Sequence, residues 1–256
     1  MKFFLVGLLA ISTANMSAQE GESSADVEMC ADRPGASTGT GVMGQFQFQW
    51  ETGFGFENNK YNGADEKTYT INTSLFRLGL TDVAELRLQV DEQYVKSGSN
   101  DGIGGLCPLV VGTKVKLFNG YKAVPQGAML CNLTIPSGKD EFKSEHLAPS
   151  LYLLFDNQLC DKWSLGYNVG GEWDGESSHA TTFVALCLGY SICDKLSAFV
   201  ENYDYFHSEC KPVWMTEFGF AWQVAKRVQL DVAGDLNLRD PVKQYAVSCG
   251  LAWLIN

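Results

Sequence analysis

The sequence predicts an all-β fold, a transmembrane antiparallel up-and-down β-barrel of about twelve strands. Two kinds of pattern predict it: side chains that alternate between polar and apolar, and an N-terminal segment typical of exported proteins. The composition agrees, because 19% of the residues are charged and 26 are glycine, which suits a wall of small and apolar side chains.

The N-terminus has the order of a secretory signal peptide. Lys2 precedes the apolar run Phe3–Ile11, which falls short of the roughly 18 apolar residues of a membrane helix. Met16-Ser17-Ala18 forms the expected cleavage region, and Ser12-Thr13-Ala14 is the alternative. We therefore expect residues 1–18 to be a signal peptide that directs the chain to the bacterial outer membrane.

Two further regions follow the signal peptide. Residues 19–41 are rich in Gly, Ser, Thr and acidic side chains and carry no periodic pattern. Such a composition favours an extended segment, so we expect a periplasmic N-terminal extension over 19–41. The barrel itself is expected over residues 42–256.

The first strand shows the pattern most clearly. Within residues 45–56, Gln45, Gln47, Gln49 and Glu51 fall on one face of a strand, and four Phe and one Trp fall on the other. A polar face rich in amides and an aromatic opposite face fit a wall with water inside and lipid outside. A soluble two-sheet sandwich is the alternative, since its core could also bury such aromatics.

The same alternation recurs along the chain in segments of roughly ten residues, the length of a tilted barrel strand. The predicted strands are 43–56, 68–80, 84–96, 108–118, 126–135, 148–157, 162–173, 181–191, 196–206, 213–223, 227–238 and 244–255. The predicted lipid-facing residues are Leu86, Leu88, Val90, Val111, Val115, Leu117, Trp163, Leu165, Tyr167, Val169, Phe218, Phe220, Trp222, Val228, Leu230, Val232, Tyr245, Val247, Cys249, Leu251 and Trp253.

Strand 196–206 leaves two possibilities open. Leu196, Ala198 and Val200 compete with Phe199, Tyr203 and Tyr205 for the lipid face. If Phe199 and Tyr203 turn inward beside Glu201, an aromatic solute could stack on them.

Short and long connections alternate between the strands. Tight turns are expected around Thr81-Asp82, Cys160-Asp161, Cys193-Asp194 and Ala225-Lys226, and polar loops over 57–67, 97–107, 136–147, 174–180, 207–212 and 239–243. This alternation is typical of outer-membrane barrels, whose tight turns face the periplasm. The eight cysteines contain no Cys-x-x-Cys pair, and Cys160 and Cys193 occupy equivalent turns.

Two sequence blocks resemble a known family. Asp32-Arg33-Pro34 followed by Gly44-Gln45-Phe46-Gln47-Phe48-Gln49-Trp50-Glu51-Thr52-Gly53 resembles the opening of the outer-membrane transporters named for the meta-cleavage pathway of phenol degradation. Leu78-Gly79-Leu80-Thr81-Asp82-Val83-Ala84-Glu85-Leu86-Arg87 resembles the second recurring block of that family. The resemblance implies an outer-membrane barrel with a transport role. One departure is the C-terminus, Trp253-Leu254-Ile255-Asn256, which lacks the terminal aromatic residue that many barrels present to the insertion machinery.

The candidate site is the inward face of the wall. Charged residues on that face are expected to line the lumen and to pair with one another, because unpaired charge in a narrow lumen is costly. The set could be a selectivity surface for a polar solute or a structural plug of ion pairs. The lumen-lining candidates are Glu51, Arg77, Glu85, Arg87, Asp91, Lys114, Lys116, Glu172, Glu217, Asp231 and Asp235.

Enzymatic chemistry has little support in the sequence. His146, His179 and His207 all fall in predicted loops, and His207-Ser208 cannot direct both side chains to one face of a strand. The sequence shows no Gly-x-Ser-x-Gly elbow, metal-ligand cluster or phosphate loop, so no cofactor is expected. A net charge of −11 argues against nucleic acid as a partner.

We therefore expect a channel for passive passage of small solutes, with hydrophobic or aromatic compounds as one candidate class. A structural or adhesin-like barrel with a filled lumen is the second hypothesis, and a lipid-modifying enzyme is the third. The expected partners are outer-membrane lipid, the barrel insertion machinery and a small-molecule solute.

Overall fold

The structure is a computed structural model that describes residues 29–61, 64–98, 101–121, 123–207, 214–237 and 242–256. These residues form an all-β fold. Within them, no helix has the length and apolar character needed to cross a membrane. The expected signal peptide lies outside the described residues.

Thirteen strands make up the described part of the fold. They are β1 (Phe48–Tyr61), β2 (Ala64–Thr81), β3 (Ala84–Ser97), β4 (Ile103–Leu106), β5 (Leu109–Phe118), β6 (Gln126–Ile135), β7 (Ala148–Gln158), β8 (Trp163–Glu172), β9 (Thr181–Cys193), β10 (Leu196–Phe206), β11 (Met215–Ala225), β12 (Val228–Asn237) and β13 (Val242–Leu254).

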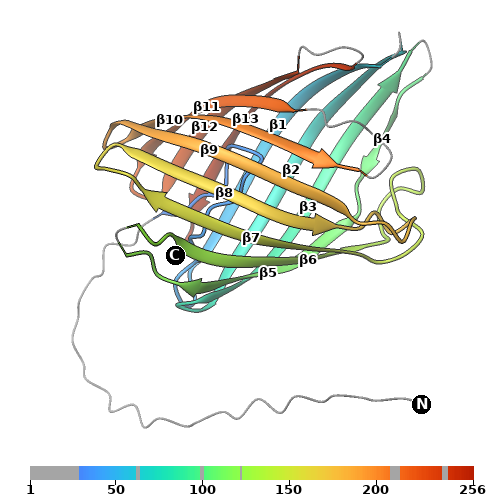
Figure 1. The fold of residues 1–256 in the computed structure, drawn as a ribbon. Coiled ribbons are helices and arrows are strands. Elements are labelled where there is room, and N and C mark those ends of the chain that lie inside the picture. The colour runs from blue at the N-terminus through green and yellow to red at the C-terminus, as the bar shows by residue number, and fades with distance from the viewer. Residues whose placement is uncertain (1–28, 62–63, 99–100, 122, 208–213, 238–241) are drawn as a thin grey trace, which may run out of the picture.

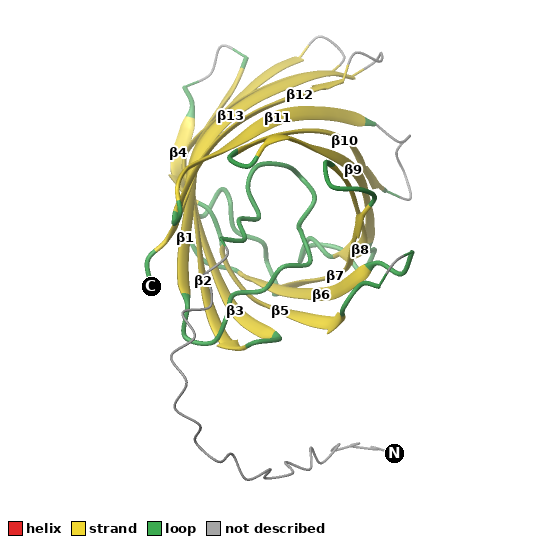
Figure 2. Ribbon diagram, turned by 90° about the vertical axis from the view of Figure 1, so that its left-hand side faces the viewer, coloured by secondary structure: helices red, strands yellow, loops and turns green. Residues whose placement is uncertain are grey.

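Twelve of the strands close into an antiparallel barrel, which confirms the predicted fold class (Figures 1 and 2). Each barrel strand pairs with the next one along the chain, and β1 closes the ring by pairing with β13 from Gln49↔Leu254 to Tyr61↔Val242. The short strand β4 adds to β3 at Glu92–Val95, beyond the part of β3 that pairs with β5. Closure pairs the backbone groups of every wall strand and leaves no open edge to lipid.

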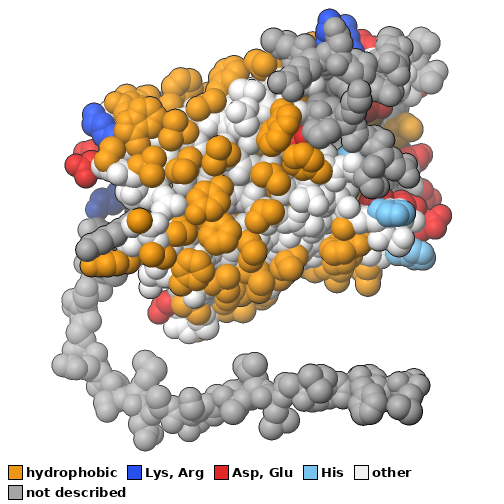
Figure 3. Space-filling view, in the orientation of Figure 1, with side chains coloured by type: hydrophobic (Ala, Val, Ile, Leu, Met, Phe, Trp, Pro, Cys, Tyr) orange, Lys and Arg blue, Asp and Glu red, His pale blue; other side chains and the backbone are white. Residues whose placement is uncertain are grey.

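Hydrophobic side chains are spread over the face of the wall that Figure 3 shows. Representative lipid-facing residues keep large exposed fractions, among them Phe220 at 48%, Val232 at 51% and Val247 at 54%. Inward positions on the same strands are buried, including Glu217 and Asp231. Strand β10 follows the same rule: Val200 is exposed on the outside, whereas Glu201 is buried inside, so Phe199 and Tyr203 also face the lumen.

Two predicted loops are wrong in part. Residues 57–67 were expected to form a loop, but β1 and β2 continue as a hairpin through this range and pair as far as Tyr61↔Ala64. Residues 97–107 contain β4. The prediction followed the apolar alternation, which ends in this range. Backbone pairing does not depend on apolar side chains, so the ladder continues through polar residues such as Glu57 and Lys67.

The start of the first strand also differs from the prediction. Residues 43–47 do not extend β1; they form a turn in which the Gln47 N–H donates to the Gly44 carbonyl at 3.0 Å. The Phe46 N–H donates to the carbonyl of Gly79 at 2.9 Å, which ties this turn to β2. A Cβ on Gly79 would collide with the Gly44 backbone, so glycine is required there.

The outward position of Leu230 on β12 makes a direct test of the wall's orientation. We expect Leu230→Arg to lower the free energy of unfolding by about 2–4 kcal/mol if the side chain lies near the bilayer midplane. Denaturant unfolding of protein folded into lipid vesicles measures this. Asp161→Arg, in an exposed tight turn, is the matched control and should have little effect. Equal stability of both variants would contradict the assigned faces.

Candidate functional site

The lumen is occupied by the chain's own N-terminal region. Residues 29–43, here called the lumen segment, run inside the ring of strands (Figure 2) and bond to inward side chains on many of them. The described part of the expected periplasmic extension, residues 29–41, therefore lies inside the barrel. The physical reason is that twelve strands enclose more space than their inward side chains fill, and this polar segment supplies partners for those side chains.

Three cations on one side of the lumen converge on a single carboxylate of the segment. We call Arg77 of β2, Arg87 of β3 and Lys114 of β5 the basic cluster. The Lys114 Nζ lies 2.7 Å from Oδ1 of Asp32, and the Nη1 atoms of Arg87 and Arg77 lie 2.5 and 3.5 Å from Oδ2. The side chains of Arg77 and Lys114 have no solvent exposure. Charge-assisted bonds of this kind are among the strongest polar contacts in proteins.

Two wall carboxylates complete this cluster. Glu51 of β1 lies 3.0 Å from Arg77, and Glu85 of β3 lies 2.9 Å from Arg77 and 2.8 Å from Arg87. Both acids also bind the segment's backbone, because Glu51 accepts from the Asp32 N–H at 3.1 Å and Glu85 accepts from the Met43 N–H at 2.8 Å. The wall and the segment thus share one hydrogen-bonded network.

The neighbouring residue Arg33 reaches the other side of the barrel. Its Nη2 lies 3.0 Å from Oδ1 of Asp231 on β12, whose carboxylate has no solvent exposure. The guanidinium passes over Gly53 and Gly250, where a Cβ on either residue would collide with it. Glycine at these paired positions of β1 and β13 therefore makes room for the Arg33–Asp231 ion pair.

A row of acids lies on β10, β11 and β12, and two of its three members bind the segment without cations. We call Glu201, Glu217 and Asp235 the acidic row; they are cross-strand neighbours. Glu201 accepts from the Ser37 N–H at 2.8 Å and the Ser37 hydroxyl at 2.5 Å, and Glu217 accepts from the Ala36 N–H at 3.0 Å. Within the described chain, none of the three carboxylates has an ion pair. Backbone amides of the segment therefore stabilise this side of the lumen.

The remaining contacts fix the middle of the segment. The Thr38 N–H donates to Oδ1 of Asn168 on β8 at 2.7 Å, and the Asn168 amide donates back to the Thr38 carbonyl at 3.0 Å. The Thr40 N–H and hydroxyl both donate to Oδ2 of Asp156 on β7 at 2.7 Å. The segment is held by side chains of the wall, and β-ladder pairing plays no part between residues 32 and 40.

A small cavity remains beside the segment. It has a volume of about 150 Å³ and lies between the segment's Ala36 and Thr38 and the inward side chains of the wall. Its lining includes polar groups (Arg87, Gln89, Asn132, Asn168) and apolar or aromatic ones (Leu75, Leu130, Leu154, Tyr152, Phe183, Tyr205). Phe183 packs against Tyr205 at 4.9 Å and Tyr152 at 5.8 Å between ring centroids. Tyr203, which also faces inward, packs against Phe183 at 6.4 Å between ring centroids and adds aromatic surface on the same side.

The other predicted lumen residues have separate surroundings. Asp91 accepts from the Thr73 hydroxyl at 2.6 Å and the Gln89 amide at 2.7 Å, and Asp235 accepts from the Tyr203 hydroxyl at 3.0 Å. Glu172 accepts from the Tyr152 hydroxyl at 2.5 Å. Lys116 is half-buried on β5 and has no ion pair within the described chain.

Sequence reasoning missed the segment's own residues. Asp32, Arg33, Ser37 and Thr40 were not among the candidates, nor was Glu201. One signal was available: Asp32-Arg33 places opposite charges side by side in a stretch that is otherwise small and polar.

Catalytic and metal chemistry gain no support from the described residues. The Nδ1 of His207 lies 3.0 Å from the Thr181 hydroxyl, but this pair is exposed at the end of the barrel away from the tight turns. Within the described ranges, no group of His, Cys, Asp and Glu is placed to hold a metal ion. The seven described cysteines are free, and Cys160 and Cys193 are both exposed.

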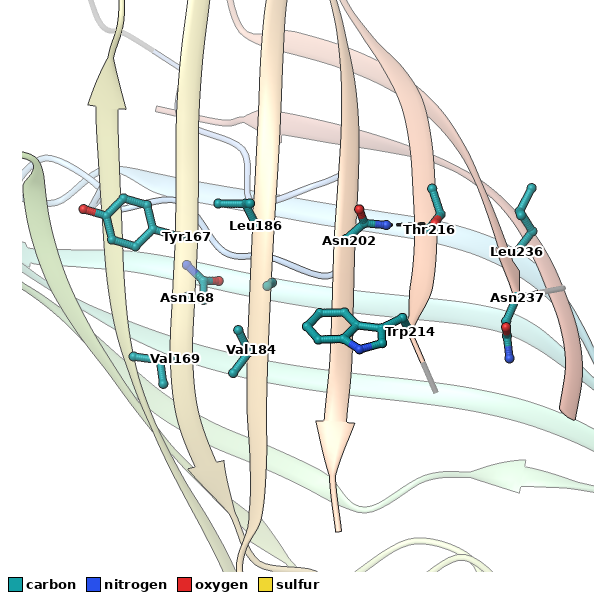
Figure 4. Close-up of a pocket in the computed structure, with 11 residues that line it drawn as sticks. Tyr167, Asn168, Val169, Val184, Leu186, Asn202, Trp214, Thr216, Leu236 and Asn237 are labelled. Atoms are coloured by element: carbon teal, nitrogen blue, oxygen red, sulfur yellow. Dashed lines mark hydrogen bonds between the residues drawn. The ribbon is translucent and has the colours of Figure 1, made fainter. Parts of the chain in front are cut away.

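A larger hollow of about 960 Å³ lies on the outside of the wall, across β8 to β12. Most of its lining residues are outward side chains, including Tyr167, Leu186 and Trp214 (Figure 4). At its floor the Asn202 amide donates to the Thr216 hydroxyl at 2.8 Å and to the Met215 carbonyl at 3.3 Å. A polar group that faces lipid without a hydrogen-bond partner is unfavourable, so these hydrogen bonds stabilise the outer face of the wall.

The contacts of Asp32 predict how firmly the segment is held. We expect Asp32→Asn to speed amide exchange of residues 36–40 about 10–100-fold, because hydrogen bonds between charged groups contribute roughly 1.5–3 kcal/mol. Hydrogen-exchange mass spectrometry measures this. Asp65→Asn, which removes the exposed 3.9 Å pair with Lys67, is the control. Unchanged exchange in Asp32→Asn would show that the carboxylate does not anchor the segment.

Comparison with solved structures supports the fold. A COG4313 outer-membrane channel from Pseudomonas putida F1 is similar with a TM-score of 0.68 and 15% sequence identity, covering 87% of this chain and 99% of that one. The KdgM porin in complex with disordered oligogalacturonate has a TM-score of 0.52 and 9% identity, with 80% and 99% covered. The translocator domain of the autotransporter NalP from Neisseria meningitidis has a TM-score of 0.52 and 8% identity, with 81% and 88% covered. At these identities the likeness concerns the fold alone.

Comparison at the level of sequence gives the family. No curated protein matches the sequence. A family model described as "Putative MetA-pathway of phenol degradation" matches residues 31–255, which include most of the lumen segment and the whole barrel. This match confirms the resemblance of the two sequence blocks. The chain belongs to this family, described by its link to the MetA pathway of phenol degradation.

Proposed function

We propose that the protein is a channel in the bacterial outer membrane for the passive passage of small solutes, exported there by its N-terminal signal peptide. The main support for this proposal is the nature of the material inside the lumen. Much of the space inside the wall is occupied by a separate segment held by polar contacts, beside a cluster of wall side chains that includes Leu130, Leu154 and Phe183. A filling of that kind can move without breaking the barrel.

The segment and the remaining cavity together suggest which solutes pass. The cavity of about 150 Å³ admits only a small molecule, and its mixed aromatic and amide lining suits a solute with an apolar body and a polar group. Larger movement of the segment would widen the path. We propose no catalytic role, since the exposed His207–Thr181 contact has no carboxylate partner in the described part of the chain.

Removal of the segment tests the channel directly. We expect deletion of residues 29–41 to raise single-channel conductance several-fold in planar lipid bilayers, because the wall side chains alone leave the lumen open. A deletion of residues 174–178, in the exposed connection between β8 and β9, is the control and keeps the segment in place. Heat-modifiable migration on gels verifies that both variants are folded. Conductance as low as that of the intact protein would contradict a segment-filled lumen.

A pair of charge substitutions separates selectivity from structure. Glu51 is fully buried against Arg77, so Glu51→Gln should lower the free energy of unfolding by about 3–5 kcal/mol.

Asp91 has only neutral hydrogen-bond donors in the described part of the chain, so Asp91→Asn should leave stability nearly unchanged. If Asp91 faces the solute path, its removal should shift the reversal potential away from cation selectivity. Unaltered selectivity in Asp91→Asn would remove that residue from the path.

A further inference from the structure

We propose that the basic cluster is a binding site for the carboxylate of a small solute, and that Asp32 occupies this site as an internal ligand with which the solute competes. The proposal rests on the proposed channel function, since the solute must reach the lumen. It adds a ligand class and a location that the fold and the family do not specify.

The cluster has the construction of an anion site. Three cationic groups from three adjacent wall strands meet at one carboxylate, and two of the three side chains have no solvent exposure. Lys114 also donates to the carbonyl oxygens of Gly39 and Gly41 at 3.0 and 2.8 Å. The wall acids Glu51 and Glu85 hold the two arginines, the segment's carbonyl groups hold Lys114, and all three cations point to one place.

The wall alone cannot neutralise these charges. Arg77 pairs with Glu51 and Glu85, and Arg87 pairs with Glu85. Among the described residues, the one carboxylate that pairs with Lys114 is Asp32. A buried ammonium without a counter-charge is strongly unfavourable. Any state in which the segment leaves the cluster therefore needs another anion near Lys114.

The anion that fits is a small carboxylate. The present occupant is a single carboxylate, so a solute with one such group restores the same charge balance. Arg87 belongs both to the cluster and to the lining of the 150 Å³ cavity, which gives a solute in the cavity contact with the site. The apolar side chains of Leu130, Leu154 and Phe183 in the same cavity suit the rest of such a molecule.

Chemical rescue tests the site. Asp32→Gly in the full-length protein leaves the space of the carboxylate empty and should raise conductance in planar bilayers. Acetate at constant ionic strength should then bind the cluster, let the segment dock again and return the conductance toward that of the unaltered protein. Acetamide, a neutral molecule of similar size, should have no effect. Equal responses to acetate and acetamide would overturn the site.

A second variant and a second readout keep the test independent of conduction. In Asp32→Gly combined with Lys114→Met, the positive charges of Arg77 and Arg87 are balanced by Glu51 and Glu85. Acetate should therefore no longer bind the cluster or change the conductance. Acetate should raise the thermal unfolding temperature of Asp32→Gly but not of the double variant. If no variant conducts yet this stabilisation occurs, the channel proposal fails and the carboxylate site stands. If the variants conduct but acetate stabilises neither, the site fails and the channel stands.

Competition tests the last part of the proposal. In the unaltered protein, acetate should speed amide exchange of residues 36–40, because it displaces Asp32 from the basic cluster, whereas acetamide should not. Exchange that is independent of acetate would overturn displacement.

Discussion

The inner wall of the barrel carries buried charge that its own strands do not balance locally. On one side the basic cluster of Arg77, Arg87 and Lys114 exceeds its wall acids, and on the other the acidic row has no cation. In a confined space this imbalance would be costly, and contacts with the lumen segment reduce that cost. Asp32 completes the first side, whereas Arg33 and the backbone amides of Ala36 and Ser37 serve the second.

The wall was predictable because its residues obey a strict local rule. Alternation with a period of two gave β3 and the strands from β5 onward within a few residues, and it placed Leu88, Phe220 and Val247 on the exposed face. The inward direction of Glu85 and Lys114 followed from the same rule. In β10 both faces carry apolar side chains, so the sequence left its orientation open until the burial of Glu201 resolved it.

The contents of the lumen were not predictable in the same way. Residues 29–41 have no periodicity, and their position depends on partners that lie far along the chain. Ser37 binds Glu201 and Thr40 binds Asp156, contacts that no local pattern encodes. From sequence alone, a short polar segment is predicted to extend into solvent. Its place in the lumen becomes predictable only when the unbalanced charges on the inner face of the wall are considered. The adjacent Asp32 and Arg33 carry that information, but only once the positions of the strands are known.

The span of the ion pairs has a consequence for assembly. Asp32 bonds to strands from the first half of the chain, but Arg33 bonds to Asp231, which is 198 residues further along. The segment leaves the export machinery first, yet its full set of contacts exists only after β12 has joined the sheet. The Arg33–Asp231 ion pair therefore forms late in folding, once β12 is in place. The lumen segment can therefore make all of its ion pairs only when the barrel is nearly complete.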